Sequence, residues 1–253
     1  MNVVAVIQAR MGSTRLPGKV LADLAGVPML DRVVERVCRA RVNAVWVACP
    51  VNRTDDAIAA RCRILGVPVF RGTEDDVLGR FVGAAEASRA DVVVRLTADC
   101  PLLDNAIIDR VAAEVIAYAG TDYASNVTAR SYPRGLDVEA FTREALVRMD
   151  QLGQSPAARE HVTIPVRLEH PEAFRCRTVR NEVDDSDLRW TVDTPEDLEF
   201  IRLAYRTLGL ATRPGSYREL VAWCRANPQW TRRDEGTTWD PSRLGSITIE
   251  GGR

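Results

Sequence analysis

The chain has 253 residues, 46% of them hydrophobic, and its 34 basic and 35 acidic residues leave a net charge of −1. This length can fill one large core, and the even mixture of charges argues against a basic nucleic-acid arm or an acidic tail. No apolar run approaches the roughly 20 residues of a membrane span, and residues 1–7 do not resemble a signal sequence. We therefore expect a soluble, cytoplasmic protein with no nucleic-acid or membrane partner.

The first half of the chain alternates short apolar runs with amphipathic segments. The expected strands are residues 3–7, 44–49, 67–70 and 92–96, and the expected helices are residues 28–40, 54–65, 74–88 and 105–118. Thr54 is the expected N-cap of the second helix, with two aspartates in its first turn. This alternation is typical of an open, mostly parallel, Rossmann-like α/β sheet.

From about residue 121 the alternation breaks. Short strands are expected at 123–125, 137–141, 174–179 and 188–192, and helices at 143–149, 157–169 (broken by Pro165), 195–208 and 216–226. Asp193 and Thr194 cap the helix that begins at Pro195. We expect an α/β domain over residues 1–210 with an irregular α+β insertion at about 121–180. Residues 211–253 should form a C-terminal helix and a tail, with residues 231–253 on the surface.

The segment after the first expected strand is the most informative part of the chain. Residues 8–19 read Gln-Ala-Arg-Met-Gly-Ser-Thr-Arg-Leu-Pro-Gly-Lys, and Lys19 is the only lysine among the 34 basic residues. An ammonium group meets a phosphate oxygen as a point charge, which the planar fork of arginine does not do. A loop with glycine, serine and several cations is typical of a polyphosphate site.

Two nucleotide motifs do not fit this loop. The Walker A pattern is G-x-x-x-x-G-K-[ST], whereas five residues separate Gly12 from Gly18 and Val20 follows Lys19. A G-x-G-x-x-G dinucleotide motif is also absent from the sequence. The groups expected to bind a triphosphate are the amides near Gly12 and Ser13 and the side chains of Arg10, Arg15 and Lys19. The alternative is a surface turn with incidental arginines.

Two aspartates stand where expected strands end. Asp99 follows the strand at 92–96, and Asp193 follows the one at 188–192. Open α/β sheets bind ligands at the carboxyl ends of their strands, and two carboxylates can hold a hard cation such as Mg²⁺ together with phosphate oxygens and water. The alternatives are a turn before Pro101 for Asp99 and a simple helix cap for Asp193.

Zinc and disulfide chemistry are not expected. The six cysteines are scattered without a C-x-x-C pair, and His161 and His170 are the only histidines. Zinc sites need clustered ligands, and disulfide frameworks belong mainly to small secreted domains. The thiols should be reduced and mostly buried.

Residues 8–21 resemble the signature loop of the cytidylyltransferases, which make CMP-activated 3-deoxy-manno-octulosonate (KDO) and CMP-sialic acids. The residues of this loop are most similar to those of the spore-coat polysaccharide branch, SpsF. Residues 70–78, 96–101 and 190–198 strengthen the likeness, which covers roughly residues 1–210. It implies that Asp99 and Asp193 bind Mg²⁺, that Arg71 and Gly72 lie near the nucleoside, and that the enzyme is a homodimer.

Base and acceptor recognition fall on other segments. Cytosine needs a donor and acceptors along one edge, and backbone groups of Ala9, Thr97 and Ala98 can supply them if their strands are parallel neighbours. The alternation at residues 136–139 places Asp137 and Glu139 on one strand face. By resemblance, residues 132–139 and 159–162 serve the acceptor and the dimer contact. The acceptor candidates are Arg134, Asp137, Glu139 and His161; solvated faces are the alternative for each.

The expected reaction joins CTP and a small anionic acceptor and releases pyrophosphate. Arg15, Lys19 and Asp99 are the expected catalytic residues, because charge must be balanced on the triphosphate and at the α-phosphorus. The acceptor is a 2-keto sugar acid or a small phosphonate. Alternatives are a transferase that uses UTP or GTP, and a non-catalytic nucleotide-binding partner in a polysaccharide pathway.

Overall fold

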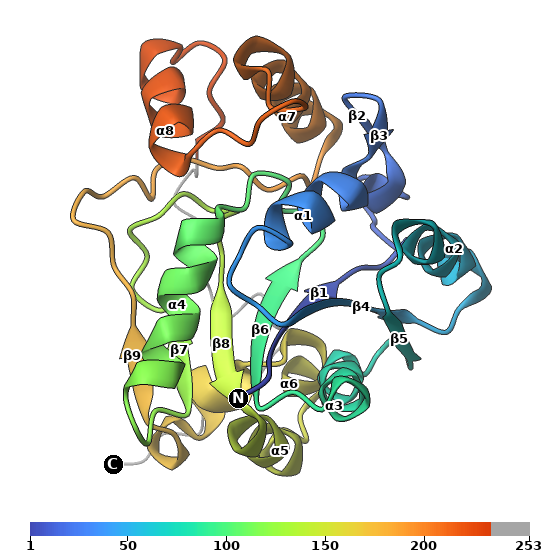
Figure 1. The fold of residues 1–253 in the computed structure, drawn as a ribbon, viewed down its shortest axis with the longest axis vertical. Helices are drawn as coiled ribbons and strands as arrows, with labels where there is room; N and C mark the ends of the chain where they lie inside the picture. The colour runs from blue at the N-terminus through green and yellow to red at the C-terminus, as the bar shows by residue number, and fades with distance from the viewer. Residues whose placement is uncertain (234–253) are drawn as a thin grey trace.

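The structure, a computed structural model, describes residues 1–233 and contains a seven-stranded mixed sheet (Figure 1). Its strands are β1 (Val3–Gln8), β4 (Ala44–Pro50), β5 (Val69–Gly72), β6 (Val92–Thr97), β7 (Tyr123–Ser125), β8 (Glu139–Thr142) and β9 (Cys176–Thr178). The order across the sheet is β5-β4-β1-β6-β8-β7-β9. The first four neighbours are parallel, whereas β8 runs antiparallel to both β6 and β7. The expected α/β fold is confirmed, and its second half is mixed.

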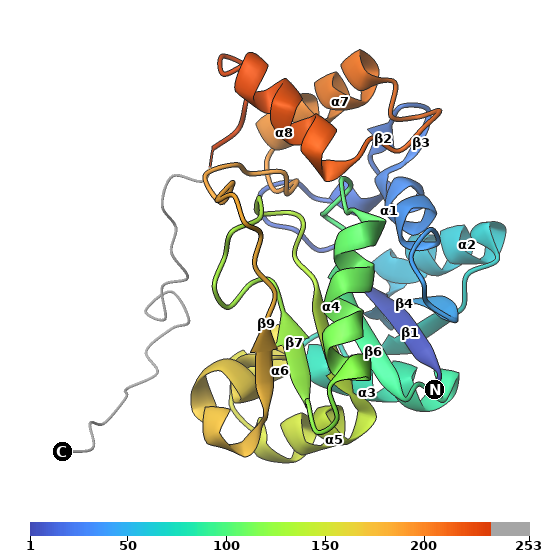
Figure 2. The same cartoon turned by 60° about the vertical axis from the view of Figure 1, so that its left-hand side comes forward.

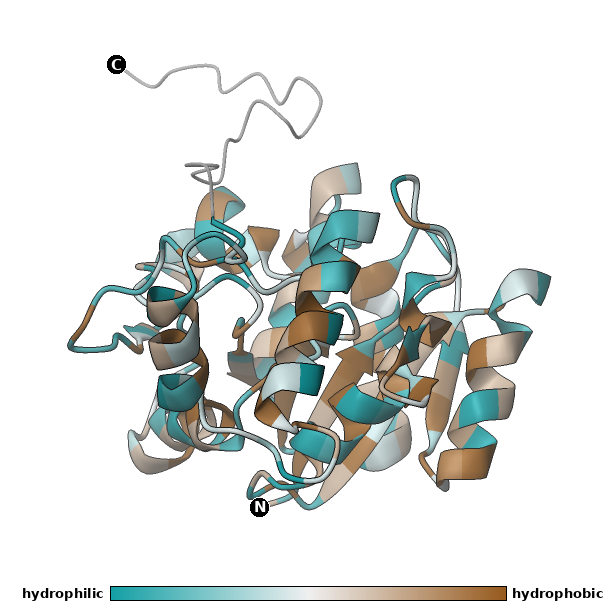
Figure 3. Cartoon of the chain, turned by 90° about the horizontal axis from the view of Figure 1, so that it is seen from above, coloured by the Kyte–Doolittle hydropathy of each residue, from teal (hydrophilic) through white to brown (hydrophobic). Residues whose placement is uncertain are grey.

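Helices cover both faces of this sheet. The helices on one face are α1 (Met29–Val37), α2 (Asp56–Leu65) and α4 (Asn105–Ala117); those on the other are α3 (Val77–Ser88), α5 (Arg143–Leu152) and α6 (Pro156–His161). Each face of the sheet packs on its own hydrophobic core, and successive residues of β1 point into these two cores alternately. Ala5 and Ile7 pack with α1 and α4, whereas Val4 and Val6 pack with α3. An uninterrupted apolar strand is therefore required, as the sequence predicted. Figure 3 shows hydrophobic ribbon in the central strands and on parts of the helices around them.

The last two helices lie together at one end of the molecule (Figures 1 and 2). They are α7 (Pro195–Leu208) and α8 (Tyr217–Ala226), and a short hairpin of β2 (Asp23–Leu24) and β3 (Val27–Pro28) packs near α7. Phe200 and Trp223 bring α7 and α8 into contact, with ring centroids 5.8 Å apart. A complete capping box of Thr194 and Asp197 starts α7, which confirms its predicted N-terminus.

Three expected elements differ from the structure. Thr54 does not cap α2, because residues 53–55 form a 3-10 turn and the Asp55 carboxylate accepts the Met11 N–H at 2.8 Å. The expected strand at 188–192 is absent, and only isolated bridges occur there.

The helix expected at 157–169 breaks at Val162 (φ 54°) rather than at Pro165, which begins a π-helical turn over residues 165–169. The surface tail predicted for 231–253 lies outside the described residues beyond Arg233. Within residues 1–233, none of the helices combines the length and the apolar character needed to cross a bilayer.

Candidate functional site

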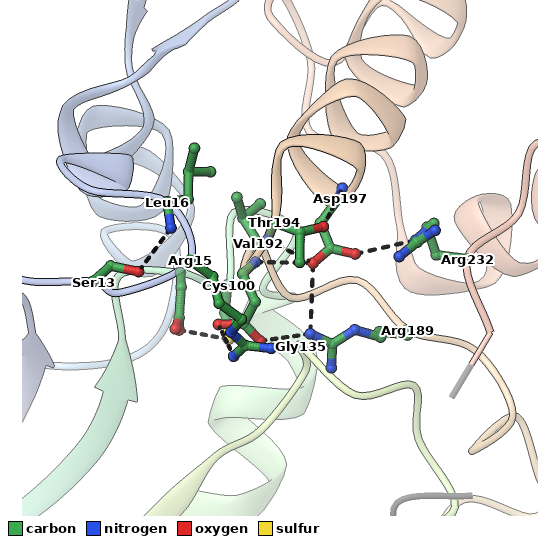
Figure 4. Close-up of polar contacts among 12 residues, drawn as sticks. Ser13, Arg15, Leu16, Cys100, Gly135, Arg189, Val192, Thr194, Asp197 and Arg232 are labelled. Atoms are coloured by element: carbon green, nitrogen blue, oxygen red, sulfur yellow. Dashed lines mark hydrogen bonds and ion pairs between the residues drawn. The ribbon is translucent and has the colours of Figure 1, made fainter. Parts of the chain in front are cut away.

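The loop between β1 and the 3-10 turn Lys19–Leu21 folds back on itself. Gly18 has a φ of 72°, a conformation that costs glycine little, and its N–H donates to the Met11 carbonyl at 3.0 Å. Ser13 Oγ accepts the Leu16 N–H at 3.3 Å (Figure 4). These contacts turn Lys19 inward, where only 9% of its surface is exposed.

Lys19 lies between the two predicted metal carboxylates. Its Nζ donates to Asp99 Oδ2 at 2.9 Å, to Asp193 Oδ1 at 2.9 Å and to the Val192 carbonyl at 2.8 Å. Burial lowers the pKa of Lys19, but the two aspartates outweigh burial, so the pKa is raised and the ammonium stays charged. We expected this group on the triphosphate, and in the structure it joins two segments 94 residues apart in their numbering, from Asp99 to Asp193.

Asp99 and Asp193 are brought together by the backbone as well. The Val192 N–H donates to the Asp99 carbonyl at 2.9 Å. Asp99 Oδ1 accepts the Thr97 hydroxyl at 2.7 Å, and the Asp193 carboxylate contacts Arg15 at 3.2 Å and Arg189 at 2.5 Å. Burial raises the pKa of Asp193, but the Lys19 charge and hydrogen bond outweigh it, so the pKa is lowered and the carboxylate is ionised.

This donor set fits a hard divalent cation. The two carboxylates converge on the Lys19 ammonium, so a divalent cation would bind at their other oxygens or replace the ammonium between them. Within residues 1–233, no three acidic, histidine or cysteine side chains gather into a complete metal site. The remaining ligands would have to be phosphate oxygens and water, which is the arrangement that Mg²⁺ favours. The site therefore suits a cation that arrives with a phosphorylated substrate.

The nucleotide candidates gather around a cavity of about 270 Å³. Those that line it are Ala9, Arg10, Gly12, Ser13, Arg15, Lys19, Thr97 and Ala98. Ala9 and Ala98 meet because β1 and β6 are parallel neighbours with Gln8 opposite Thr97. Arg71 and Gly72 lie elsewhere, on β5, which β4 separates from β1. The Arg71 guanidinium donates to the Pro50 and Asn52 carbonyls and to Asp56.

A second cavity, of about 880 Å³, adjoins the first and shares Thr97, Asp99 and Asp193 with it. Three acceptor candidates, Arg134, Asp137 and Glu139, line it, and His161 does not. Five arginines face this space: Arg95, Arg130, Arg134, Arg167 and Arg189. The cavity thus combines many cations with the carboxylates that hold them in place.

The carboxylates of this second cavity are bound by arginines. Arg130 donates from Nη1 to Asp137 Oδ1 at 2.6 Å and from Nη2 to Asp137 Oδ2 at 2.9 Å, and Arg95 donates to Glu139. Burial raises the pKa of Asp137 and of Glu139, but the neighbouring arginine charges outweigh it and both pKa values are lowered. Because each carboxylate is ionised, neither is arranged to donate a proton.

Sequence reasoning missed Arg95 and Arg189. Arg95 lies on β6 and connects the two cavities, because its guanidinium contacts Glu139 and also Gln8 Oε1 at 3.2 Å. The sequence of β6 gave a hint, since the charged Arg95 interrupts its apolar run. Arg189 forms an ion pair with Asp193, which lies four residues later in the chain. This short separation was the signal in the sequence that could have identified Arg189.

Known proteins match this chain along most of its length. The family model described as cytidylyltransferase matches residues 4–207. The spore coat polysaccharide biosynthesis protein SpsF of Bacillus subtilis (strain 168) is 36% identical over 237 residues, which are 90% of this chain and 95% of the relative. A 3-deoxy-manno-octulosonate cytidylyltransferase of Anaeromyxobacter dehalogenans (strain 2CP-C) is 34% identical over 239 residues, covering 79% of this chain and 96% of the relative.

A solved structure agrees with these relatives. A cytidylyltransferase from Leptospira borgpetersenii serovar Hardjo-bovis (strain JB197) superimposes with a TM-score of 0.86 at 34% identity, covering 91% of this chain and 96% of that one. The resemblance drawn from residues 8–21 and the fold expected with it are confirmed.

Proposed function

This chain belongs to the cytidylyltransferase family, and from that premise we propose that it transfers CMP from CTP to a small anionic acceptor and releases pyrophosphate. The observation that carries the proposal is the meeting of two cavities at Asp99 and Asp193. One cavity is lined by the cationic loop and the other by arginines. A nucleotide and an acidic acceptor can therefore approach the same pair of carboxylates from two sides.

The nucleotide half of the reaction falls to the loop. Arg10, Gly12, Ser13 and Arg15 line the first cavity, where their amides and cationic side chains would bind phosphate oxygens. These cations balance the charge that grows on the leaving pyrophosphate. Lys19 holds the carboxylates of Asp99 and Asp193 close together, where they would accept a cation that enters with CTP.

The proposed chemistry is an in-line displacement. An acceptor oxygen forms a bond to the α-phosphorus, the bond between the α-phosphorus and the bridging oxygen breaks, and pyrophosphate leaves with that electron pair. A hydroxyl acceptor gives up its proton, and we assign no single residue as its base; Asp137, which lines the acceptor cavity, is a candidate. Asp99 and Asp193 would hold a divalent cation, which when bound neutralises phosphate charge and polarises the phosphoryl group.

The acceptor cavity offers cations to an acidic substrate. Five arginines and five carboxylates line it, and arginine is the residue type that binds carboxylate and phosphonate groups through paired donors. Its volume of about 880 Å³ accommodates a sugar acid as well as a small phosphonate. Magnesium as the cation, the homodimer and the cytoplasmic location stay predictions of the sequence.

A pyrophosphate-release assay tests the proposal. Protein is mixed with CTP, Mg²⁺ and a panel of 2-keto sugar acids and small phosphonates, with UTP and GTP as parallel nucleotides. We expect release with CTP and one acidic acceptor, and at least about a 100-fold lower rate for Asp99→Asn, because the cation site loses one of its two charges. CTP binding without release for every acceptor would instead identify a nucleotide-binding module, and faster release with UTP or GTP would reassign the base.

A further inference from the structure

The chain returns to the candidate site after the part that the family model covers. That model ends at residue 207, and α8 follows. The Arg189 N–H then donates to the Arg232 carbonyl at 3.0 Å, and Leu188 and Arg233 form an antiparallel bridge. Arg189 is also bridged to Arg134, which lines the acceptor cavity. Residues 232–233, here called the C-terminal segment, thus pack against the wall of that cavity.

A series of charged contacts runs from this segment to Asp193, and Figure 4 shows Arg232, Asp197 and Arg189 of this series. Arg232 Nε donates to Asp197 Oδ1 at 3.1 Å. The other oxygen, Asp197 Oδ2, accepts the N–H groups of Asp193 and Thr194, each at 3.0 Å. Arg189 Nη2 lies 3.6 Å from this oxygen and 2.5 Å from Asp193 Oδ2. Asp197 therefore fixes the backbone of Asp193, and Arg189 fixes its side chain.

Asp197 needs both arginines because it is buried. Only 1% of its surface is exposed, and a carboxylate at such a position is costly unless opposite charges and hydrogen bonds surround it. Without Arg232, the charge of Asp197 would draw Arg189 toward itself and away from Asp193. The oxygen atoms offered to a cation would then shift.

We propose that Arg232 is a positioning residue for Asp193, so that the C-terminal segment completes the cation-binding half of the active site. The inference rests on the proposed function in one respect, the binding of a divalent cation by Asp193. A purely local role is the competing explanation. Arg232 is 41% exposed in its side chain, and such ion pairs contribute little to stability.

The test measures cation binding directly in the full-length protein. Mn²⁺ is titrated into protein saturated with CTP and free of acceptor, and binding is followed by electron paramagnetic resonance. We expect Arg232→Ala to weaken Mn²⁺ binding about tenfold, the usual scale for a group that supports a metal ligand. Arg232→Lys keeps one charged donor and should recover part of the loss.

The matched control is Arg213→Ala. Arg213 also lies in the C-terminal extension and pairs with Glu219 near the start of α8, but it lines neither cavity of the site. This variant should bind Mn²⁺ as the parent does. In turnover, Arg232→Ala should raise the half-saturating cation concentration by the same factor of about ten, with kcat recovered at high cation.

The outcomes separate the inference from the proposed function. An unchanged Mn²⁺ affinity in Arg232→Ala, with or without a lower melting temperature, would overturn the positioning role. A parent protein that binds no Mn²⁺ would overturn it as well. If the parent binds CTP and Mn²⁺ but no acceptor yields pyrophosphate, the proposed function fails, while the effect of Arg232→Ala on Mn²⁺ binding still decides the inference.

Discussion

Lys19 makes three contacts that only a compact cation makes well. Its acceptors are two carboxylate oxygens and one carbonyl, all within 2.9 Å of Nζ. The three N–H donors of an ammonium point in tetrahedral directions, whereas the donors of a guanidinium lie in one plane. In a chain whose other basic residues are arginines, geometry at this point explains why lysine is used.

The exchange Lys19→Arg tests this explanation. We expect kcat to fall about 100-fold or more, because the larger planar group pushes Asp99 and Asp193 apart while it preserves the charge. Steady-state pyrophosphate release at saturating CTP measures the loss. Arg53→Lys, an exposed exchange that lies outside both cavities, is the control. A kcat close to the parent value in Lys19→Arg would mean that charge alone suffices.

The sequence identified single residues where their type was unusual. Lys19, Asp99 and Asp193 were predicted because a lone lysine and two aspartates after expected strands stand out, and the structure brings the three together. Arg95 and Arg189 were missed because the chain has many arginines and the sequence does not show which carboxylate each of them contacts. Their roles follow from the carboxylates that they contact, which only tertiary structure supplies.

At the scale of elements, Glu139 of β8 connects its own strand to β6, to β7 and to the loop at Thr163. It stands opposite Arg95 of β6 across the β6–β8 ladder, and its carboxylate accepts from Arg95. It also accepts the Tyr123 hydroxyl of β7 at 2.6 Å and the Thr163 hydroxyl at 2.7 Å. Because 3% of its surface is exposed, these partners replace water. The pairing holds the antiparallel half of the sheet against the parallel half.

Glu139→Gln should therefore destabilise the protein. Loss of one partner of a buried ion pair costs about 3–5 kcal/mol, since Arg95 would keep its charge without a counterion. Urea unfolding at pH 7 measures the change. Glu144→Gln removes an acidic group from the exposed first turn of α5 and should cost less than about 1 kcal/mol. Equal effects of the two variants would show that the buried pair adds nothing.

The same pair predicts a pH dependence. The arginine charges outweigh burial and lower the pKa of Glu139 in the folded state, so its contribution to stability is present above the ordinary glutamate pKa of about 4.3. That contribution is lost as the pH falls through the lowered value. The difference in unfolding free energy between the parent and Glu139→Gln should be full at pH 7 and should shrink below about pH 4. A difference that stays constant from pH 7 to pH 3 would contradict the assignment.

The elements that the sequence misassigned share a physical cause. Leu188, Trp190 and Val192 are fully buried, and this alternation was interpreted as a strand. Alternation reports which side of an extended segment is buried, but it does not report a neighbour with which to form a ladder. Here the neighbours are irregular, at Arg134 and Arg233, so single bridges form.

At the scale of the whole molecule, the C-terminal helices belong to the main core. Residues of α7 and α8, among them Ile201, Leu220 and Cys224, pack in the same hydrophobic cluster as β1, α1 and α4. The sequence suggested a boundary near residue 210, where the family resemblance ends. The shared core predicts that residues 211–233 unfold together with the rest, because shared packing couples the two parts.

Leu220→Ala tests this coupling. Leu220 is 1% exposed, so its truncation leaves a cavity and should lower the free energy of unfolding by about 2–5 kcal/mol. If one core unites the chain, tryptophan fluorescence and far-ultraviolet circular dichroism should give coincident urea transitions, both shifted to lower urea. Ile64→Ala, at a residue with 72% exposure, is the control and should change stability by less than about 0.5 kcal/mol.

The result also bears on how the active site stays assembled. A variant in which α8 melts first, in a separate early transition, would assign residues 211–233 to an independent unit, and the boundary near 210 would stand. A single shifted transition would mean that Arg232 and the wall beside Arg189 are held by the same core that supports Asp99. In that case the core anchors α8, and α8 anchors the start of the segment whose Arg232 contacts Asp197 beside Asp193.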